Sequence, residues 1–409
     1  MDNRNDSFVT SVRDMIALGF LGVAGNISPF ILPLIVGALV DYVGLSIQQA
    51  SYVASADMFG LGIGTLIWSR FILTSNWRRF ALLAAALLFS GNLLCAFSDA
   101  FISAAISRFI AGLGGGLMLA IGVSGLASTV NPDRIVGVYT ILVTLVASII
   151  LFVFPYLLAQ SGAKGMFLAM AGLSCMAGVS SFFIPRKSTS SDQPNGPEPE
   201  AASSGQGARS PQIVRWMGVF GVFVSFFGMS LFWVYIERVG VVTGFVTSQI
   251  STGLGTAQLM GVLGAGTAAI VATRFGSRLV PVMLALGLSL LASVMIPAMS
   301  GFAFYLVAAS ALLFSWNMFY PYVIGIMISL DSTAKLVTYS MLMMTLGKSL
   351  SPLVGAIIVT ETNYDSAYWL CVGAFVLSAV LFLPALRATD QRLRATDLSS
   401  TGISTTATQ

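Results

Sequence analysis

The sequence predicts an all-α membrane protein with twelve transmembrane helices in two pseudo-symmetric six-helix bundles. Of its 409 residues, 56% are hydrophobic and only 9% are charged, and the mean hydropathy is +0.89. Soluble domains carry about 25% charged residues, so most of this surface must face lipid. A transmembrane helix needs roughly 20 apolar residues, and the chain is long enough for twelve of them joined by short loops.

Twelve apolar runs follow one another along the chain, and most are long enough to span a bilayer. Lipid offers no hydrogen-bond partner to free backbone groups, so we expect each run to be a helix. The first six cover 14–38, 49–73, 80–98, 101–125, 135–158 and 163–184. The second six cover 215–237, 248–272, 279–298, 302–329, 336–360 and 366–386. Pro29 and Pro33 are expected to bend the first run.

A polar segment divides the two sets of runs. From Pro185 to Pro211 it is rich in Pro, Ser and Gly and almost free of apolar side chains, a composition that cannot bury enough surface to become ordered. We therefore expect a six-helix bundle over 1–184, a flexible cytoplasmic linker over 185–213, a second bundle over 214–388 and a disordered tail over 389–409.

The positions of the cations predict the orientation in the membrane. With the N-terminus in the cytoplasm, 16 of the 20 Lys and Arg residues lie inside. Only Lys164 and Arg238 lie outside, and Arg108 and Lys348 fall within spans. Cytoplasmic loops are enriched in Lys and Arg, so we expect both termini on the cytoplasmic side. We expect the membrane to be a bacterial inner membrane. The same distribution accounts for the pI of about 9.0 without a nucleic-acid partner.

The residue types that are absent exclude several kinds of chemistry. The chain has no histidine, and its three cysteines lie singly within apolar runs. Catalytic triads, Cys-His nucleophiles and histidine zinc sites are therefore excluded. No GxxxxGK[ST] pattern is present to bind ATP. We expect no enzyme activity, no cofactor and no metal.

Short strings recur in corresponding runs of the two sets. GIGT ends at Thr65 and GAGT ends at Thr267, while YTILVTLVAS begins at Tyr139 and YSMLMMTLGK begins at Tyr339. Two related six-helix halves are typical of transporters, whose substrate sites lie near the bilayer midplane. The repeats therefore indicate a transporter built from two related halves.

Further motifs resemble those of the major facilitator superfamily. The fourth run reads RFIAGLGGG from Arg108 to Gly116, and the basic loops SNWRR and ATRFGSR follow the second and eighth runs. The resemblance covers nearly the whole chain and implies alternating access around a central cavity. It also implies gating roles for loop cations, namely Arg78, Arg79 and Arg274.

Three ionisable residues lie deep within the predicted spans: Asp57, Arg108 and Lys348. A charge at the bilayer centre costs at least about 2.5 kcal/mol, which makes each a functional candidate. Gly60 and Gly64 share a helical face with Asp57 and allow another helix to approach. In the fold that the chain resembles, the runs 49–73 and 336–360 pack together. We therefore expect Asp57 and Lys348 to face each other as a proton-coupling pair, or else as a purely structural ion pair.

Arg108 and several polar or aromatic residues are candidates for substrate binding. An arginine recognises a carboxylate through two parallel hydrogen bonds, although Arg108 alternatively only stabilises packing. The resemblance implies that the runs containing the other candidates line the cavity, with packing or interfacial roles as the alternative. The substrate-binding candidates are Asn26, Arg108, Phe227, Trp316, Asn317 and Tyr320.

Glu237 and Arg238 end the seventh run on the outer side. They are expected either to form an external gate or to be solvated residues at a helix end.

These observations favour a secondary active transporter of a small organic solute. Two cations against one carboxylate within the spans favour an anionic, carboxylate-bearing substrate, and Asp57 favours proton symport. One alternative is an exporter of multiple drugs or hydrophobic compounds. Another is a non-transporting sensor or scaffold, which would need a soluble output module. The expected partners are the substrate, the proton and the lipid bilayer, and we expect a monomer.

Overall fold

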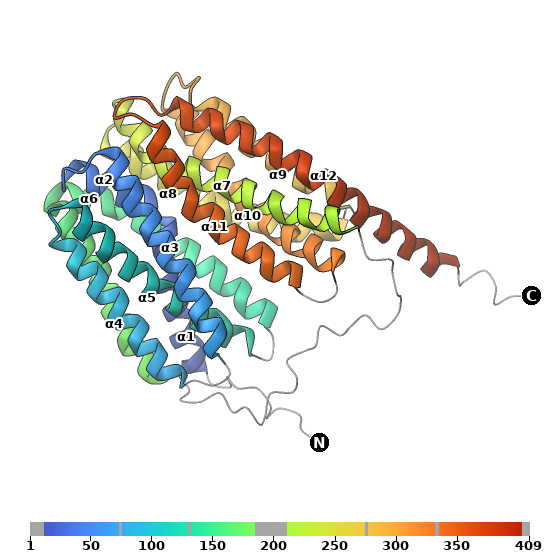
Figure 1. Ribbon diagram of the computed structural model, residues 1–409, viewed down its shortest axis with the longest axis horizontal. Coiled ribbons are helices and arrows are strands. Elements are labelled where there is room, and N and C mark those ends of the chain that lie inside the picture. Colours follow the sequence, from blue (N-terminus) through green and yellow to red (C-terminus); the bar gives the residue numbers. More distant parts are fainter. Residues whose placement is uncertain are drawn as a thin grey trace, which may run out of the picture. The chain divides into compact units, whose positions relative to one another are not determined.

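The computed structural model describes residues 12–72, 76–129, 132–184, 211–274, 277–331 and 335–402 (Figure 1). Within these ranges, the side chains of 132–134, 136, 269, 271–274 and 391–402 are not described. Most of the expected linker, 185–213, lies outside the described residues. What is described is helical apart from short turns, so the predicted all-α class is confirmed.

The helices of the first half are α1 (Val12–Phe30), α2 (Leu32–Asp41), α3 (Ile47–Phe71), α4 (Trp77–Ala96), α5 (Phe101–Ala127), α6 (Pro132–Ser180) and the short 3₁₀ helix η1 (Ser181–Phe183). Those of the second half are α7 (Gln212–Val242), α8 (Thr247–Arg274), α9 (Leu279–Met295), α10 (Phe302–Leu330), α11 (Lys335–Ile358) and α12 (Asp365–Gly402). Every predicted run has its helix, since α1 and α2 together form one bent span and α6 contains two.

The break inside α6 falls between two predicted runs. Gly162 has φ 63° and ψ −169°, a conformation with positive φ that a residue with a side chain rarely adopts. The sequence expectation of separate spans over 135–158 and 163–184 is therefore correct, and this glycine separates them.

The predicted bend of the first span is also confirmed. Helices α1 and α2 meet at 56°, next to Pro29. Leu34 N–H donates to the carbonyl of Ile31 at 3.0 Å, rather than to that of Phe30 in the α-helical pattern. The Phe30 carbonyl instead accepts the indole N–H of Trp233 at 3.1 Å. The break thus exposes a backbone acceptor that a residue of α7 satisfies.

The chain forms two compact units that do not coincide with its two sequence halves. The first contains the described residues up to 184 together with Trp233–Thr256 and Lys348–Ser366. The second contains the described parts of 201–232, 257–347 and 367–409. The proposed boundaries of the two bundles thus remain a prediction. Residues 389–402 are helical, as the end of α12, where a disordered tail was expected.

Candidate functional site

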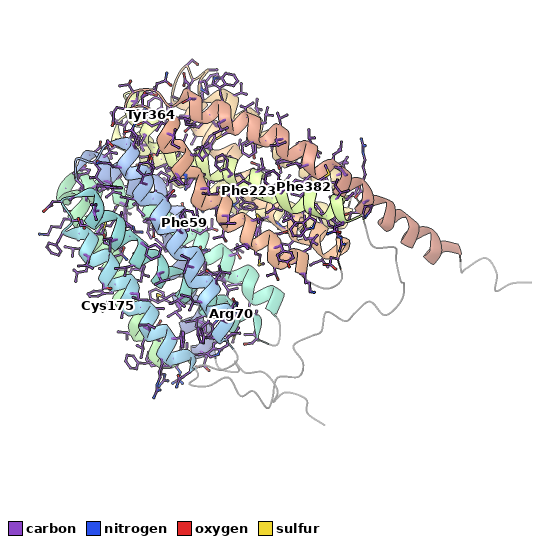
Figure 2. The ribbon with its side chains drawn as sticks, in the orientation of Figure 1. Phe59, Arg70, Cys175, Phe223, Tyr364 and Phe382 are labelled. Carbon is purple, nitrogen blue, oxygen red and sulfur yellow. The ribbon has the colours of Figure 1, made fainter. Side chains whose placement is uncertain are left out.

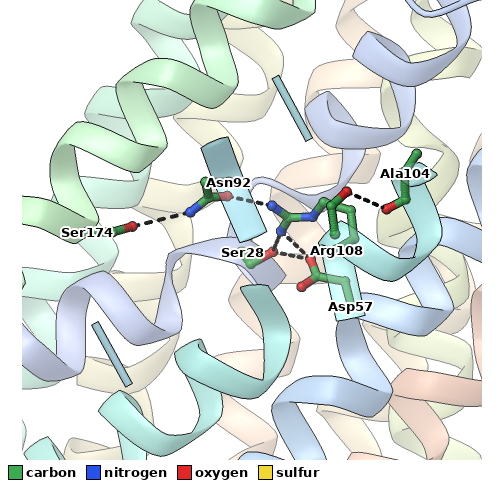
Figure 3. Close-up of polar contacts among 7 residues, drawn as sticks. Ser28, Asp57, Asn92, Ala104, Arg108 and Ser174 are labelled. Atoms are coloured by element: carbon green, nitrogen blue, oxygen red, sulfur yellow. Dashed lines mark hydrogen bonds and ion pairs between the residues drawn. The ribbon is translucent and has the colours of Figure 1, made fainter. Parts of the chain in front are cut away.

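Arg108 lies at the centre of a hydrogen-bond network in the first unit. Its side chain and that of Asp57 are both 0% exposed, and its Nη2 atom lies 2.5 Å from Asp57 Oδ2. The same nitrogen donates to Ser28 Oγ at 2.7 Å, while Nη1 donates to Asn92 Oδ1 at 2.7 Å (Figure 3). Ser28 Oγ donates in turn to Asp57 Oδ2. The guanidinium is therefore held by one charged and two neutral partners.

The network extends to a fifth helix. Asn92 Nδ2 donates to Ser174 Oγ at 3.2 Å, and Ser174 Oγ donates to the carbonyl of Met170 at 2.8 Å. Helices α1, α3, α4, α5 and α6 thus each supply one side chain. We call this set the buried network; it consists of Ser28, Asp57, Asn92, Arg108 and Ser174.

Glycines bring Asp57 and Arg108 together. A Cβ on Gly112 of α5 would lie 2.0 Å from the backbone oxygen of Asp57, and a Cβ on Gly60 of α3 would lie 2.3 Å from the backbone oxygen of Phe109. The backbones of α3 and α5 are therefore in direct contact, as small residues permit in membrane helices. Asp57 and Arg108 lie beside this contact, within one helical turn of a glycine that forms it.

Gly112→Ala is expected to lower thermal stability, because α3 and α5 must separate to admit the methyl group. The separation would also lengthen the contact between Asp57 and Arg108. Gly172→Ala in α6 is the matched control, since its Cβ would meet nothing within 4 Å; it should be neutral or stabilising by up to about 1 kcal/mol. The melting temperatures of the purified variants test this, and equal values would contradict the close packing.

The expected pairing of Asp57 with Lys348 is wrong. Asp57 pairs with Arg108, because the glycines beside it face α5 rather than α11. Helix α3 does meet α11, but half a turn earlier: Ser55 Oγ donates to the carbonyl of Ser349 at 2.7 Å. Lys348 is half-buried on α11, next to this contact.

A cavity of about 10 Å³ adjoins the buried network and is lined in part by Ser28, Asn92 and Ser174. One water molecule needs about 10–15 Å³ measured this way, together with polar partners. The space therefore suits a single water in contact with three members of the network.

A second charged cluster joins α2 to α7. Arg238 Nη1 and Nη2 donate to the two carboxylate oxygens of Asp41 at 2.8 and 2.5 Å. Its Nε and Nη2 donate to Glu237 at 2.7 and 2.9 Å. Glu237 and Arg238 are only 8% and 4% exposed, so they are not the solvated helix-end residues of one alternative. Gly37 leaves room for Glu237, whose carboxylate would lie 2.5 Å from a Cβ there.

Further hydrogen bonds join the same ends of the helices within the first unit. Tyr235 Oη and Ser51 Oγ lie 2.8 Å apart, and Gln48 Nε2 donates to the carbonyl of Val359 at 3.1 Å. These contacts join the early turns of α3 to the late turns of α7 and α11. We call them the closing layer; its members are Asp41, Gln48, Ser51, Ser55, Tyr235, Glu237, Arg238, Ser349 and Val359.

The basic residues expected to gate the other end have structural contacts where they are described. Arg78 Nη2 donates to the carbonyl of Ile184, directly after η1, at 3.2 Å, and Arg79 is exposed at the start of α4. The side chain of Arg274 lies outside the described part. Their gating roles remain predictions.

The second unit brings some of the substrate-binding candidates together. The Phe226 ring lies 5.8 Å from Trp316 and 6.4 Å from Tyr320, measured between centroids. Phe227 lies instead 6.2 Å from Phe223 (labelled in Figure 2). Phe226, rather than Phe227, is therefore the residue of α7 that joins the aromatic cluster with α10.

The two asparagine candidates lie in different units. Asn317 Nδ2 donates to the carbonyl of Leu313 on its own helix at 3.0 Å. Asn26 is half-buried on α1 in the first unit, near Ser28. Their roles in substrate binding remain predictions.

The sequence reasoning missed Ser28, Asn92 and Ser174 as partners of Arg108, and Asp41 as the partner of Arg238. A single serine or asparagine in a membrane helix carries no pattern that reveals its partner. Asp41 had a usable signal, because it ends α2 on the side of the membrane where Glu237 and Arg238 lie near the end of α7.

Comparisons with known proteins agree with this architecture. A family model described as Major Facilitator Superfamily matches residues 15–335. The inward-open xylose transporter XylE from E. coli is similar, with a TM-score of 0.72 and 14% identity. The match covers 90% of this chain and 94% of the XylE chain. A crystal structure of a D-xylose-proton symporter has a TM-score of 0.71 and 14% identity, with coverages of 91% and 97%. The nucleoside transporter NupG has a TM-score of 0.67 and 13% identity, with coverages of 91% and 99%.

No curated protein sequence gives a significant match. At these low identities the structural matches show the fold, while the family model, which spans most of the chain, shows the family. The chain therefore belongs to the major facilitator superfamily and is an integral membrane transporter, not an enzyme.

Proposed function

We propose that this protein is a proton-coupled secondary transporter that moves a small organic solute across a bacterial inner membrane by alternating access. The observation that carries the proposal is the fully buried pair of Asp57 and Arg108 in the first unit. A charge in such an environment is costly and in membrane proteins often marks a proton relay. Proton symport is also the transport mode named for one structural neighbour, a D-xylose-proton symporter.

Protonation of Asp57 would remove the negative charge that balances Arg108. Asp57 Oδ2 would lose most of its attraction for the guanidinium, while Ser28 and Asn92 would continue to hold it. Ser55, half a turn before Asp57 on α3, is bonded to α11 in the closing layer. A shift of α3 on protonation of Asp57 would therefore displace Ser55 and weaken its hydrogen bond to α11. In this way proton binding would be coupled to opening of the closing layer.

The orientation of the helices gives the closing layer its role. The charge distribution of the sequence places both termini in the cytoplasm and the closing layer on the outer side. The closing layer is then an outer gate in its shut state, and Glu237 is one of its charged members. The protein is proposed to work as a monomer.

The substrate we propose first is an organic anion with an apolar body. Asp57 and Arg108 balance each other, so Lys348 gives the three deep ionisable groups their net positive charge. The aromatic cluster of Phe226, Trp316 and Tyr320 suits an apolar group. A neutral polar solute is the second candidate, because Arg108 already has a carboxylate partner, and two structural neighbours are named for xylose and nucleoside transport.

A thermal-shift screen of the purified protein separates these substrate classes. A ligand that binds the folded state raises its melting temperature by mass action. The proposal expects small carboxylic acids to raise it and the corresponding amides to have little effect. Stabilisation by sugars or nucleosides alone would replace the first candidate by the second.

Asp57→Asn is expected to abolish substrate-driven proton uptake in proteoliposomes, because the amide cannot take up and release a proton. Counterflow of labelled substrate, which needs no net proton movement, should persist. Asp365→Asn, at an exposed acid that begins α12, is the matched control and should leave both activities intact. If Asp57→Asn retained proton uptake equal to the control, Asp57 would not be the coupling residue.

A further inference from the structure

A groove of about 570 Å³ lies between the first turns of α1 and the end of α6, with η1 at one side. All of these elements belong to the first unit. Clefts of about 300–1,000 Å³ hold most drug-sized ligands, so the groove is large enough for part of a lipid. Its walls are almost entirely apolar and include Ile16, Phe20, Met176, Val179 and Phe183.

The apolar wall is open to the surroundings of the protein. Ile16 is 67% exposed, Met176 is 61% exposed and Val179 is 57% exposed. In a membrane protein, a surface of this kind contacts acyl chains rather than water. A hollow of this size in that surface fits a hydrocarbon chain.

One cation, Arg13, lines the groove. The Arg13 side chain is 70% exposed, and its guanidinium carbon lies 5.6 Å from the centre of the Phe183 ring. Asp14, whose side chain is 16% exposed, lies 3.8 Å from Arg13 in a loose contact. Of the described residues that line the groove, Arg13 alone is charged.

We propose that this groove binds one acyl chain of an anionic glycerophospholipid, whose phosphate lies against Arg13. The sequence places the start of α1 and the end of α6 at the cytoplasmic surface, where anionic lipids attract basic residues. The apolar walls hold the chain, and the cation at the mouth selects the headgroup. This lipid site is separate from the buried network and from the proposed transport function.

The chain's own first eleven residues are a poorer occupant. They read MDNRNDSFVTS and carry two aspartates and few large apolar side chains. Polar side chains of this kind do not match the apolar walls of the groove.

Native mass spectrometry of the purified protein tests the proposal with phosphatidylglycerol and phosphatidylcholine of identical acyl chains. The wild type is expected to retain one phosphatidylglycerol in preference to phosphatidylcholine. Arg13→Gln should lower that preference about five-fold, the effect of one cation near a lipid surface. Ser180→Trp, on the groove wall, should reduce retention of both lipids.

Two matched variants control for charge and bulk outside the groove. Arg70→Gln removes an exposed cation at the end of α3, and Val153→Trp adds the same bulk at an exposed position of α6. Both should retain lipid as the wild type does. Equal binding of the two lipids by the wild type, or full retention by Ser180→Trp, would overturn the proposal. So would increased lipid retention after deletion of residues 2–11, because the N-terminal segment would then be the natural occupant.

Discussion

Replacing Arg108 by glutamine is expected to lower the free energy of unfolding by about 3–5 kcal/mol, the usual cost of breaking a buried ion pair by removing one partner. Asp57 is 0% exposed and would lose the cation that balances its carboxylate. Asn92 Oδ1 and Ser28 Oγ would also lose the guanidinium donors that they accept from. One substitution would therefore weaken the contacts among all five helices that meet at the buried network.

Thermal unfolding of detergent-purified protein measures this loss, with Arg70→Gln as the control for removal of an exposed cation. A second comparison separates the ion pair from simple packing. The double variant Asp57→Asn, Arg108→Gln should recover most of the lost stability, because neither side chain then buries an unpaired charge. A single variant as stable as the wild type, or a double variant no better than the single one, would show that the pair does not hold the bundle together.

The sequence predicts the helices of this protein well, because the physical cause of each helix is local. About 20 apolar residues in a row must span the bilayer as a helix, whatever they later pack against. The same reasoning located the bend near Pro29 and the separation of two spans that Gly162 now explains. The extension of α12 to Gly402 was missed, because residues 389–402 are polar and give no hydrophobic signal.

The partners of the buried charges could not be predicted from the sequence. The sequence shows that Asp57 and Arg108 lie within apolar runs, where a charge is costly in free energy, but their pairing depends on which helix faces which. A signal did exist: Gly60 and Gly64 on α3 have the same four-residue spacing as Gly112 and Gly116 on α5, and each of these glycines abuts the backbone of the other helix. The family resemblance pointed instead to the helix of Lys348, which α3 contacts through Ser55.

The closing layer shows a second limit of sequence reasoning. Asp41 and Arg238 are separated by 197 positions, and charged residues at helix ends are usually solvated. Nothing local distinguishes an end residue that binds another helix from one that faces water. The pair of oppositely charged ends on the same side of the membrane was the available clue.

Arg238→Gln is expected to open the closing layer. Arg238 is the cation that lies between the carboxylates of Asp41 and Glu237, and its removal would leave these two acids facing each other. The contact that crosses from α2 to α7 joins Arg238 to Asp41, whose side chain is 42% exposed. Hydrogen bonds to charged groups contribute about 1.5–3 kcal/mol, so losing this contact shifts a two-state equilibrium at least about 10-fold toward the open form. The loss falls on the closed state alone, because opening separates α2 from α7.

Labelling of an introduced cysteine measures the opening. Ser51 is fully buried in the closing layer, so Ser51→Cys should react slowly with a membrane-impermeant maleimide added outside intact cells. Adding Arg238→Gln should accelerate that reaction strongly. Arg238→Lys keeps the positive charge but loses the bidentate contact with Asp41, so it should give an intermediate rate. The protein without the added cysteine supplies the background from Cys95, Cys175 and Cys371. An unchanged rate in Arg238→Gln would mean that the hydrogen bonds of Ser55 and Gln48 suffice to hold this end shut. The charged cluster would then only strengthen a closure made by side chains of α3 that donate to the carbonyls of Ser349 and Val359.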